Sequence, residues 1–359
     1  MMRALLIRAV LAAALAVPAA PAFAQFYKSK TLTLLVNYGV GGNADTEARI
    51  YQRYLPKYIA GNPTVIIRNA PGAGGAAAIN QLGLNIASQP DGLTAGYFTT
   101  SATTSLTEDP VMRVKLYDFI PIGAAGGFNV VYARRDIVPG GMVKPSDIAK
   151  ARSVYAGGYA RGTSHDTRLR LALEIMGLPY TMVTGFPGNA QVNKAMLQNE
   201  INFTGSSLPG YHTQVIPQII NPGVGMTLFQ FPAIGADGAP VGDPMLERAG
   251  IATFDKVYAQ AFGKPPSGAK FDALLLMNDI STKLQRIVVL PKGAPAEAVD
   301  ALRQAFNALG QDKDFVEDYM KITGEEPDLM KAELIEPLFE RMRHVDPEVV
   351  RILKESVAE

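Results

Sequence analysis

The stretch TLTLLVNYGVGGNADTEARIYQRYLPKY, residues 31–58, decides the fold of this chain. Its opening residues are apolar and β-branched, which predicts a short strand over 31–37. A helix is predicted over 44–58, because apolar side chains recur there at helical spacing, at Ala48, Tyr51, Leu55 and Tyr58. A strand, a glycine-rich turn and a helix together form the first part of a strand-helix-strand unit, the building block of α/β folds.

The same alternation continues along the chain. A strand over 64–68, a helix over 76–87 and a strand over 94–99 complete a parallel unit. After residue 130 the pattern starts again, with strands predicted at 153–156, 181–186, 201–205 and 226–231 and helices at 167–176 and 191–197. Since a chain of 359 residues is long enough for about two domains, the sequence predicts two α/β halves.

Towards the C-terminus the sequence predicts an irregular segment and then helices. Residues 232–270 are rich in glycine and proline, which interrupt regular structure, so this segment is predicted to be irregular. A helix follows Pro295, with Val299, Leu302, Phe306 and Leu309 on one face. Further helices are predicted at 331–343 and 347–357.

Composition excludes several classes of function. The 34 Lys and Arg residues nearly balance the 33 Asp and Glu, so the chain lacks the basic field typical of nucleic-acid binding. The absence of cysteine excludes disulfides, thiolate metal sites and a cysteine nucleophile. The three histidines are scattered, so we predict neither a metal site nor a cofactor.

The N-terminus has the pattern of a secretory signal peptide. Arg3 and Arg8 precede an apolar run over 9–17, and Ala22-Phe23-Ala24 provides a site with small residues for cleavage after Ala24. The apolar run is shorter than the roughly 20 residues that a membrane anchor needs. We therefore expect residues 1–24 to be removed and the mature protein to be free in a bacterial periplasm.

Glycine-rich turns follow the first two predicted strands. Gly39, Gly41 and Gly42 lie between Tyr38 and a helix start at Asn43, with Asp45 in the first helical turn. Backbone amides in such a turn and the positive end of the helix suit an anion. A second turn, PGAGG at 71–75, contains Gly74, and the third strand ends in Thr99, Thr100 and Ser101. Because parallel strands end at one edge of a sheet, we expect all three segments at one crevice.

An alternative function follows from the first turn by itself. Gly39, Gly41 and Ala44 match the spacing of a dinucleotide-binding fingerprint. The second strand ends in Arg68-Asn69 and lacks the acid that holds a ribose, but Arg68 is suited to the phosphate of NADP. An exported NADP-dependent oxidoreductase is therefore a second hypothesis.

An ordered set of motifs resembles a known family. The set comprises Phe26-Tyr27-Lys28, the Gly41-Gly42…Asp45 turn, Asn69-x-PGAGG, Pro90-Asp91-Gly92 and PKGAP at 291–295. In this order they are similar to the Bug-type periplasmic solute-binding proteins of tripartite tricarboxylate transporters. Departures include Val40 and Asn43, where the family usually has Pro before the paired glycines and Ser or Thr after them.

The resemblance implies a fold, a ligand and a partner. It implies a two-lobed "Venus flytrap", an α/β fold in which each lobe is a mixed sheet flanked by helices. Residues 26–129 and 284–359 would form lobe 1, and residues 130–283 lobe 2. A small organic carboxylate would be held in the cleft by a monomer that delivers it to membrane permease subunits. A ligand-sensing role in a signalling system is an alternative output of the same fold.

The second half offers its own ligand candidates. The segment YARGTSHD, 159–166, lies between a strand and a helix, and the guanidinium of Arg161 has a geometry that can clasp a carboxylate. The resemblance places a ligand residue at Asp166, with His165 one position early. Ser164, His165 and Asp166 are adjacent and diverge, so they cannot form a catalytic triad and we expect no enzyme activity. The remaining second-half candidates are Gly162, Thr163, Ser164, Phe186 and Ser206.

Overall fold

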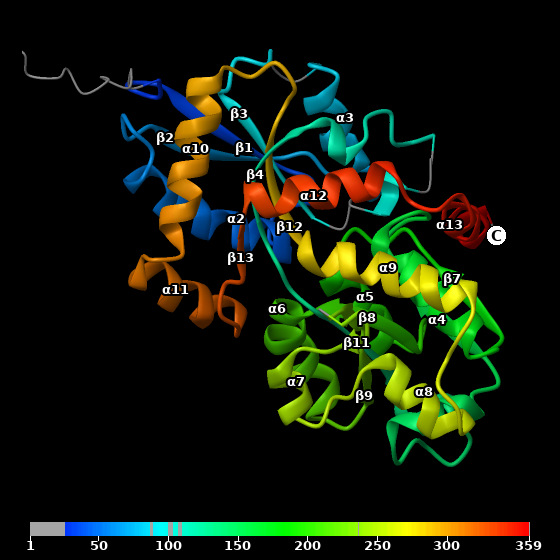
Figure 1. Cartoon of the computed structure of the whole chain (residues 1–359). Coiled ribbons are helices and arrows are strands. Elements are labelled where there is room, and N and C mark those ends of the chain that lie inside the picture. The colour runs from blue at the N-terminus through cyan, green and yellow to red at the C-terminus, as the bar shows by residue number, and fades with distance from the viewer. Residues whose placement is uncertain (1–25, 87–88, 100–102, 107–109, 236, 359) are drawn as a thin grey trace, which may run out of the picture.

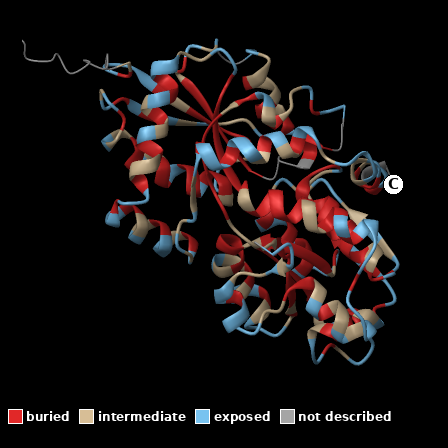
Figure 2. Cartoon of the chain, in the orientation of Figure 1, coloured by how far each residue is buried: buried red, intermediate tan, exposed pale blue. Residues whose placement is uncertain are grey.

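The computed structural model describes residues 26–86, 89–99, 103–106, 110–235 and 237–358. The predicted signal peptide with its cleavage site after Ala24 lies outside these residues, as do the predicted ligand residues Thr100 and Ser101. The described chain forms two lobes, each built around its own sheet (Figure 1). Figure 2 shows that the buried residues concentrate in the two sheets and on the helix faces that cover them.

The sheet of the first lobe is mixed. Its strands lie in the order β13-β4-β12-β3-β1-β2, of which β1, β2 and β3 are parallel and β12 runs antiparallel to its neighbours. The strands are β1 (Thr31–Val36), β2 (Thr64–Asn69), β3 (Thr94–Thr99), β4 (Ile120–Ala125), β12 (Arg286–Leu290) and β13 (Leu329–Lys331). The helices that accompany it are α2 (Asn43–Tyr54), α3 (Ala76–Gly83), α10 (Ala296–Leu309), α11 (Lys313–Thr323) and α12 (Ala332–Arg343).

The sheet of the second lobe is also mixed and has the order β7-β6-β8-β5-β9. Its strands are β5 (Asn129–Arg134), β6 (Val154–Gly157), β7 (Tyr180–Val183), β8 (Phe203–Ser207) and β9 (Gly225–Gln230). Its helices are α4 (Ser164–Ile175), α5 (Asn189–Leu197), α6 (Leu208–Gly210), a π-helix (Tyr211–Ile220) and α9 (Ala269–Lys283). Short 3-10 helices lie at Leu55–Lys57, Ala73–Gly75, Thr103–Ser105, Leu116–Asp118, Arg135–Ile137 and Pro145–Lys150. The predicted fold class, two lobes with mixed sheets flanked by helices, is confirmed.

The prediction for residues 232–270 was wrong. This segment contains α7 (Pro244–Arg248), α8 (Phe254–Phe262) and a small hairpin of β10 (Ala233–Ile234) and β11 (Pro240–Val241). Phe254 and Val257 are buried, so α8 forms because its apolar face packs on the lobe core. Helix α9 was not predicted, because polar Asn278 and Asp279 are buried together with Met277 and Ile280 and the sequence shows no one-sided pattern.

The C-terminal helix links the two lobes. The described chain passes between the sheets from β4 to β5 and returns from α9 to β12. After α12 of the first lobe, α13 (Pro347–Ala358) packs on α9 and α4 of the second (Figure 1). Ile352 and Leu353 of α13 are buried in the same apolar cluster as Leu169 of α4. The predicted division of the chain assigned this helix to lobe 1, whereas the helices on which it packs most extensively are α9 and α4.

Candidate functional site

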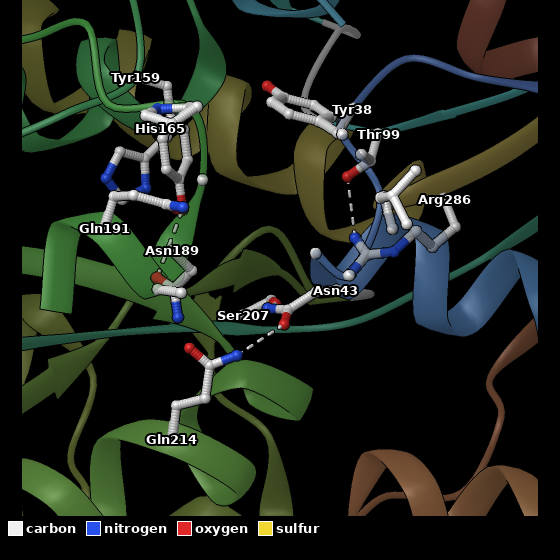
Figure 3. Close-up of a pocket in the computed structure, with 18 of the residues that line it drawn as sticks. Tyr38, Asn43, Thr99, Tyr159, His165, Asn189, Gln191, Ser207, Gln214 and Arg286 are labelled. Carbon is white, nitrogen blue, oxygen red and sulfur yellow. Dashed lines mark hydrogen bonds between the residues drawn. The ribbon is translucent and has the colours of Figure 1, made fainter. Parts of the chain in front are cut away.

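A cavity of about 200 Å³ lies between the two lobes (Figure 3). It is smaller than the roughly 300–1,000 Å³ of pockets for drug-sized ligands, so it suits a small solute better than a dinucleotide. This size argues against the NADP hypothesis. The cavity is lined by Tyr38, Gly39, Val40, Gly41, Gly42, Asn43, Ala44, Thr99, Asn129, Tyr159, His165, Pro187, Gly188, Asn189, Ala190, Gln191, Ser207, Gln214, Gln285 and Arg286.

The first wall is the turn between β1 and α2. Its shape is held by Asp45, whose carboxylate accepts a hydrogen bond of 2.9 Å from the Gly41 N–H and is also bound by Arg49. Burial raises the pKa of Asp45, but the hydrogen bonds from Arg49 and Gly41 outweigh it and keep this pKa below its usual value. Gly42, the cap residue before α2, has no side chain that could accept from the helix. The first N–H groups of α2 therefore have neither a side-chain cap nor an acceptor within the helix.

The floor of the cavity contains a buried ion pair. Nε and Nη2 of Arg286 donate to the two carboxylate oxygens of Glu47, at 2.7 and 2.5 Å. Nη1 donates to Thr99 Oγ1 at 2.9 Å and to the Gln285 carbonyl at 3.0 Å. Burial lowers the pKa of Arg286, but the adjacent Glu47 carboxylate outweighs it and raises this pKa above its usual range. Arg286 is therefore charged, and its charge is balanced by Glu47.

The second wall comes from the second lobe. Gly188, the cap residue before α5, again provides no side-chain cap, and Asn189 and Gln191 of the first helical turn line the cavity. Asn189 is fixed by hydrogen bonds to Ser206 Oγ at 3.1 Å and from Tyr159 OH at 3.4 Å. Burial, with a smaller effect of Arg168, lowers the pKa of His165 to about 3, so this ring is neutral near pH 7.

The two walls touch each other. Asn43 Nδ2 of the first lobe donates to Ser207 Oγ of the second at 3.4 Å, and Gln214 Nε2 donates to Asn43 Oδ1 at 3.4 Å. The rings of Tyr38 and Tyr159 lie edge to face, with centroids 6.1 Å apart. Figure 3 shows these side chains facing each other across the cavity. The structure is therefore a closed form, in which side chains from both lobes would surround a bound solute.

The predicted ligand residues fall into two groups. Six line the cavity: Tyr38, Gly39, Gly41, Gly42, Asn43 and Thr99. The others in the described chain lie outside its lining: Asp45, Gly74, Arg161, Gly162, Thr163, Ser164, Asp166, Phe186 and Ser206.

Several of the second group shape the contact between the lobes. A β-carbon on Gly74 would lie 2.7 Å from Thr163 Cγ2, so the second glycine turn packs directly on the second lobe. Thr104 Oγ1 donates to the Gly162 carbonyl at 3.0 Å. Thr163 caps α4, and Asp166 accepts hydrogen bonds from the Tyr159 N–H and from Thr163 Oγ1. Of the two adjacent candidates, His165 lines the cavity and Asp166 lies behind the loop.

Sequence reasoning missed the floor and most of the carboxamides. Arg286 opens the apolar run RIVVL at 286–290, and a charged residue at the start of a buried strand is a signal that could have found it. Asn129, Gln214 and Gln285 carry no local signal. Within the described residues, no cluster of His, Asp and Glu could hold a metal ion. None of the helices in this part of the chain is long and apolar enough to cross a membrane.

Comparison with known proteins adds the fold family. No family model matches the sequence, and no curated protein matches it. The structure superimposes on an adipate-bound protein of Rhodopseudomonas palustris with a TM-score of 0.66 and 17% identity, over 91% of this chain and 97% of that one. It superimposes on the periplasmic binding protein BugD with a TM-score of 0.65 and 18% identity, over 91% and 97%. The chain has the periplasmic-binding-protein fold.

A third solved structure supports the same assignment. The MatC protein of Rhodopseudomonas palustris, with bound malate, matches with a TM-score of 0.62 and 16% identity, over 91% of this chain and 98% of that one. The expected structural neighbours, Bug-type and tricarboxylate-transporter binding proteins, are thus the ones found. The cavity described above lies between the two lobes of this fold, where the two sheets come together.

Proposed function

We propose that this chain is a periplasmic solute-binding protein that captures a small carboxylate-bearing solute for a tripartite tricarboxylate-type transporter. The single observation that carries the proposal is the cavity between the lobes, which is lined by the starts of two helices without side-chain caps. Structural neighbours with bound malate and adipate support a carboxylate as the ligand.

The chemistry of the cavity supports a carboxylate at the start of α2. The N–H groups of Asn43 and Ala44 have no acceptor within the helix, and both residues line the cavity. Such N–H groups and the helix dipole form a ready anion site. The carboxylate would bridge the lobes through the contacts of Asn43 with Ser207 and Gln214, so that binding would stabilise the closed form.

The arrangement supports binding without catalysis. The His165 ring nitrogen faces the Gly157 carbonyl at 3.4 Å, and Asp166 Oδ1 accepts from the Tyr159 N–H. His165 is therefore not oriented by Asp166 as a general base would be. Asp166 instead holds the start of α4 and its loop through Thr163 and the Tyr159 N–H.

We further propose that the protein is exported and delivers its solute to the transporter. The signal peptide would be cleaved after Ala24 and the mature monomer would diffuse in the periplasm. Its closed form would be presented to the permease subunits. Deleting the gene and measuring both solute uptake and the induction of transport genes distinguishes delivery to a permease from a signalling output.

The test is a melting-temperature screen of the mature chain, Gln25 to Glu359, against a panel of carboxylic acids. A ligand that binds only the folded state at about 100 times its Kd stabilises it by about 2.7 kcal/mol. We expect at least one acid to raise the Tm by several degrees, and mass spectrometry of co-purifying solutes to identify a carboxylate.

A pair of variants provides the control for this screen. Asn43→Asp places a negative charge at the helix start that lines the cavity and should abolish the stabilisation. Asn62→Asp adds the same charge at an exposed loop and should retain it. If no acid at about 10 mM raises the Tm of the wild type, the proposed function is wrong. If both variants respond as the wild type does, the carboxylate does not lie at the start of α2.

A further inference from the structure

The charges at the cavity limit what it can hold. Among the described residues that line the cavity, the charged side chain is that of Arg286. Four of its five N–H groups donate hydrogen bonds within the protein. Two go to Glu47, one to Thr99 and one to the Gln285 carbonyl. Arg286 therefore cannot clasp a ligand carboxylate with two parallel hydrogen bonds, and Glu47 cancels its charge.

The positive potential that remains comes from the two helix starts. Each helix N-terminus is equivalent to about half of a positive charge, so α2 and α5 together supply about one. The His165 ring on the second wall is buried and hydrogen-bonded to a carbonyl, and it adds no charge near neutral pH. This potential balances one carboxylate, and a second carboxylate would be enclosed without a compensating cation.

The polar side chains around the rest of the cavity are mostly carboxamides. Gln191 and Gln214 lie on the second wall with Asn189, and Asn129 donates to Gln285 Oε1 at 2.8 Å on the floor. A carboxamide can both donate and accept hydrogen bonds without carrying charge. Such a wall matches a hydroxyl or an amide of a ligand better than it matches an ionised group.

We propose that the cavity selects a small monocarboxylate whose far end carries an uncharged hydrogen-bonding group, such as a carboxamide, and disfavours the dicarboxylate of the same shape. This inference rests on the proposed function and refines its ligand class. The carboxylate would lie at the start of α2, and the uncharged end would face the carboxamides.

The test compares acids that differ by one charge and almost nothing in shape. Isothermal titration of the mature wild-type chain at about pH 7.5 would use succinamate against succinate and glutaramate against glutarate; at this pH both carboxyl groups of each diacid are ionised. We expect the half-amide of the better-fitting pair to bind at least about tenfold more tightly. Equal or tighter binding of the diacid in both pairs would overturn the inference while leaving the proposed function intact. Absence of binding by these four acids, together with the absence of any Tm rise across the panel of carboxylic acids, would overturn both.

A pH series tests the same point without any change to the protein. Lowering the pH protonates the second carboxyl of the diacid and makes it a monoanion. The affinity for succinate should therefore rise between about pH 7.5 and pH 5 relative to that for succinamate, which controls for changes in the protein itself. A constant ratio of the two affinities across this range would contradict the inference.

A variant of Glu47 should weaken the preference for the half-amide. Glu47→Gln removes the charge that balances Arg286 without touching the cavity lining, so the site gains about one positive charge. We expect the ratio of diacid to half-amide affinity to rise about tenfold. Glu348→Gln, which removes an exposed carboxylate paired with Arg351 on α13, should leave the ratio unchanged. If the Glu47→Gln variant folds and its ratio of diacid to half-amide affinity is unchanged, the Arg286–Glu47 pair does not set the charge of the cavity.

Discussion

Two glycine-rich turns with similar sequences have different surroundings in this molecule. The turn over 39–42 follows β1 and the turn over 71–75 follows β2, and Tyr38 OH donates to the Gly74 carbonyl at 3.1 Å. A β-carbon on Gly39 or Gly41 would meet nothing within 4 Å, whereas one on Gly74 would meet Thr163 and Ala160 of the second lobe. In the first turn glycine leaves room for a ligand, and in the second it lets the lobes approach.

The largest effect is expected at the helix that follows the first turn. Glu47→Ala leaves Arg286 buried without its partner, and such a loss typically costs about 3–5 kcal/mol. Urea denaturation would measure it. Glu348→Ala breaks an exposed, solvent-screened pair with Arg351 and should cost far less stability. Similar losses of unfolding free energy in Glu47→Ala and Glu348→Ala would show that the buried Arg286–Glu47 pair does not stabilise the helix after the first turn.

The loop that receives the second turn should show opposing pH effects. His165 has a folded pKa of about 3, below its ordinary 6.5, so its contribution to stability is full above 6.5 and is lost as the pH falls towards 3. Burial raises the pKa of Asp166 from 3.8 to about 6, so its contribution is full below 3.8 and is lost as the pH rises to 6. Between about pH 4 and 6 the two contributions offset each other.

Two variants expose this balance. As the pH falls from 6 to 4, His165→Gln should gain about 2–3 kcal/mol of stability relative to wild type, and Asp166→Asn should lose a similar amount. Unfolding by urea at a series of pH values measures both. If the unfolding free energies of the wild type and both variants change in parallel with pH, the pKa shifts of His165 and Asp166 are contradicted.

A smaller effect on stability is expected at the second turn itself. Gly74 has a φ of 62° and Gly177, outside the cavity lining, has 66°, so alanine at either position costs about 1–2 kcal/mol of backbone strain. A β-carbon at Gly177 meets nothing, so only Gly74→Ala should also push the lobes apart and weaken ligand binding. Titration with the best acid from the screen compares the two variants. Equal affinities would mean that the contact of Gly74 with Thr163 is not needed for closure.

The smallest effect on stability is expected at the first turn. Gly42 has an extended backbone that serine can adopt, and Gly42→Ser adds a side-chain cap worth a few tenths of a kcal/mol to α2. The same hydroxyl competes with the ligand for the N–H groups, so affinity should fall several-fold. Lys331→Ser caps α12, away from the cavity, and should raise stability without this loss. Unchanged affinity in Gly42→Ser would place the carboxylate elsewhere.

The sequence predicted the elements whose causes are local. The strand at 31–36 and the helix from Asn43 follow from side-chain periodicity, and the turn between them follows from glycine. Because parallel strands end at one edge, the meeting of Tyr38 with Thr99 at the cavity could also be expected. Helix α8 and helix α9 could not, since the burial that stabilises them comes from residues distant in sequence.

By itself the sequence determined the two α/β halves and the glycine turns, because strand, helix and turn preferences depend on neighbouring residues. Only the tertiary structure decided which turn opens into the cavity and which one joins the lobes. It also placed Arg286 against Glu47, because β12 inserts next to β3 from the far end of the chain. Such convergence depends on strand order and lobe packing, which no local pattern records.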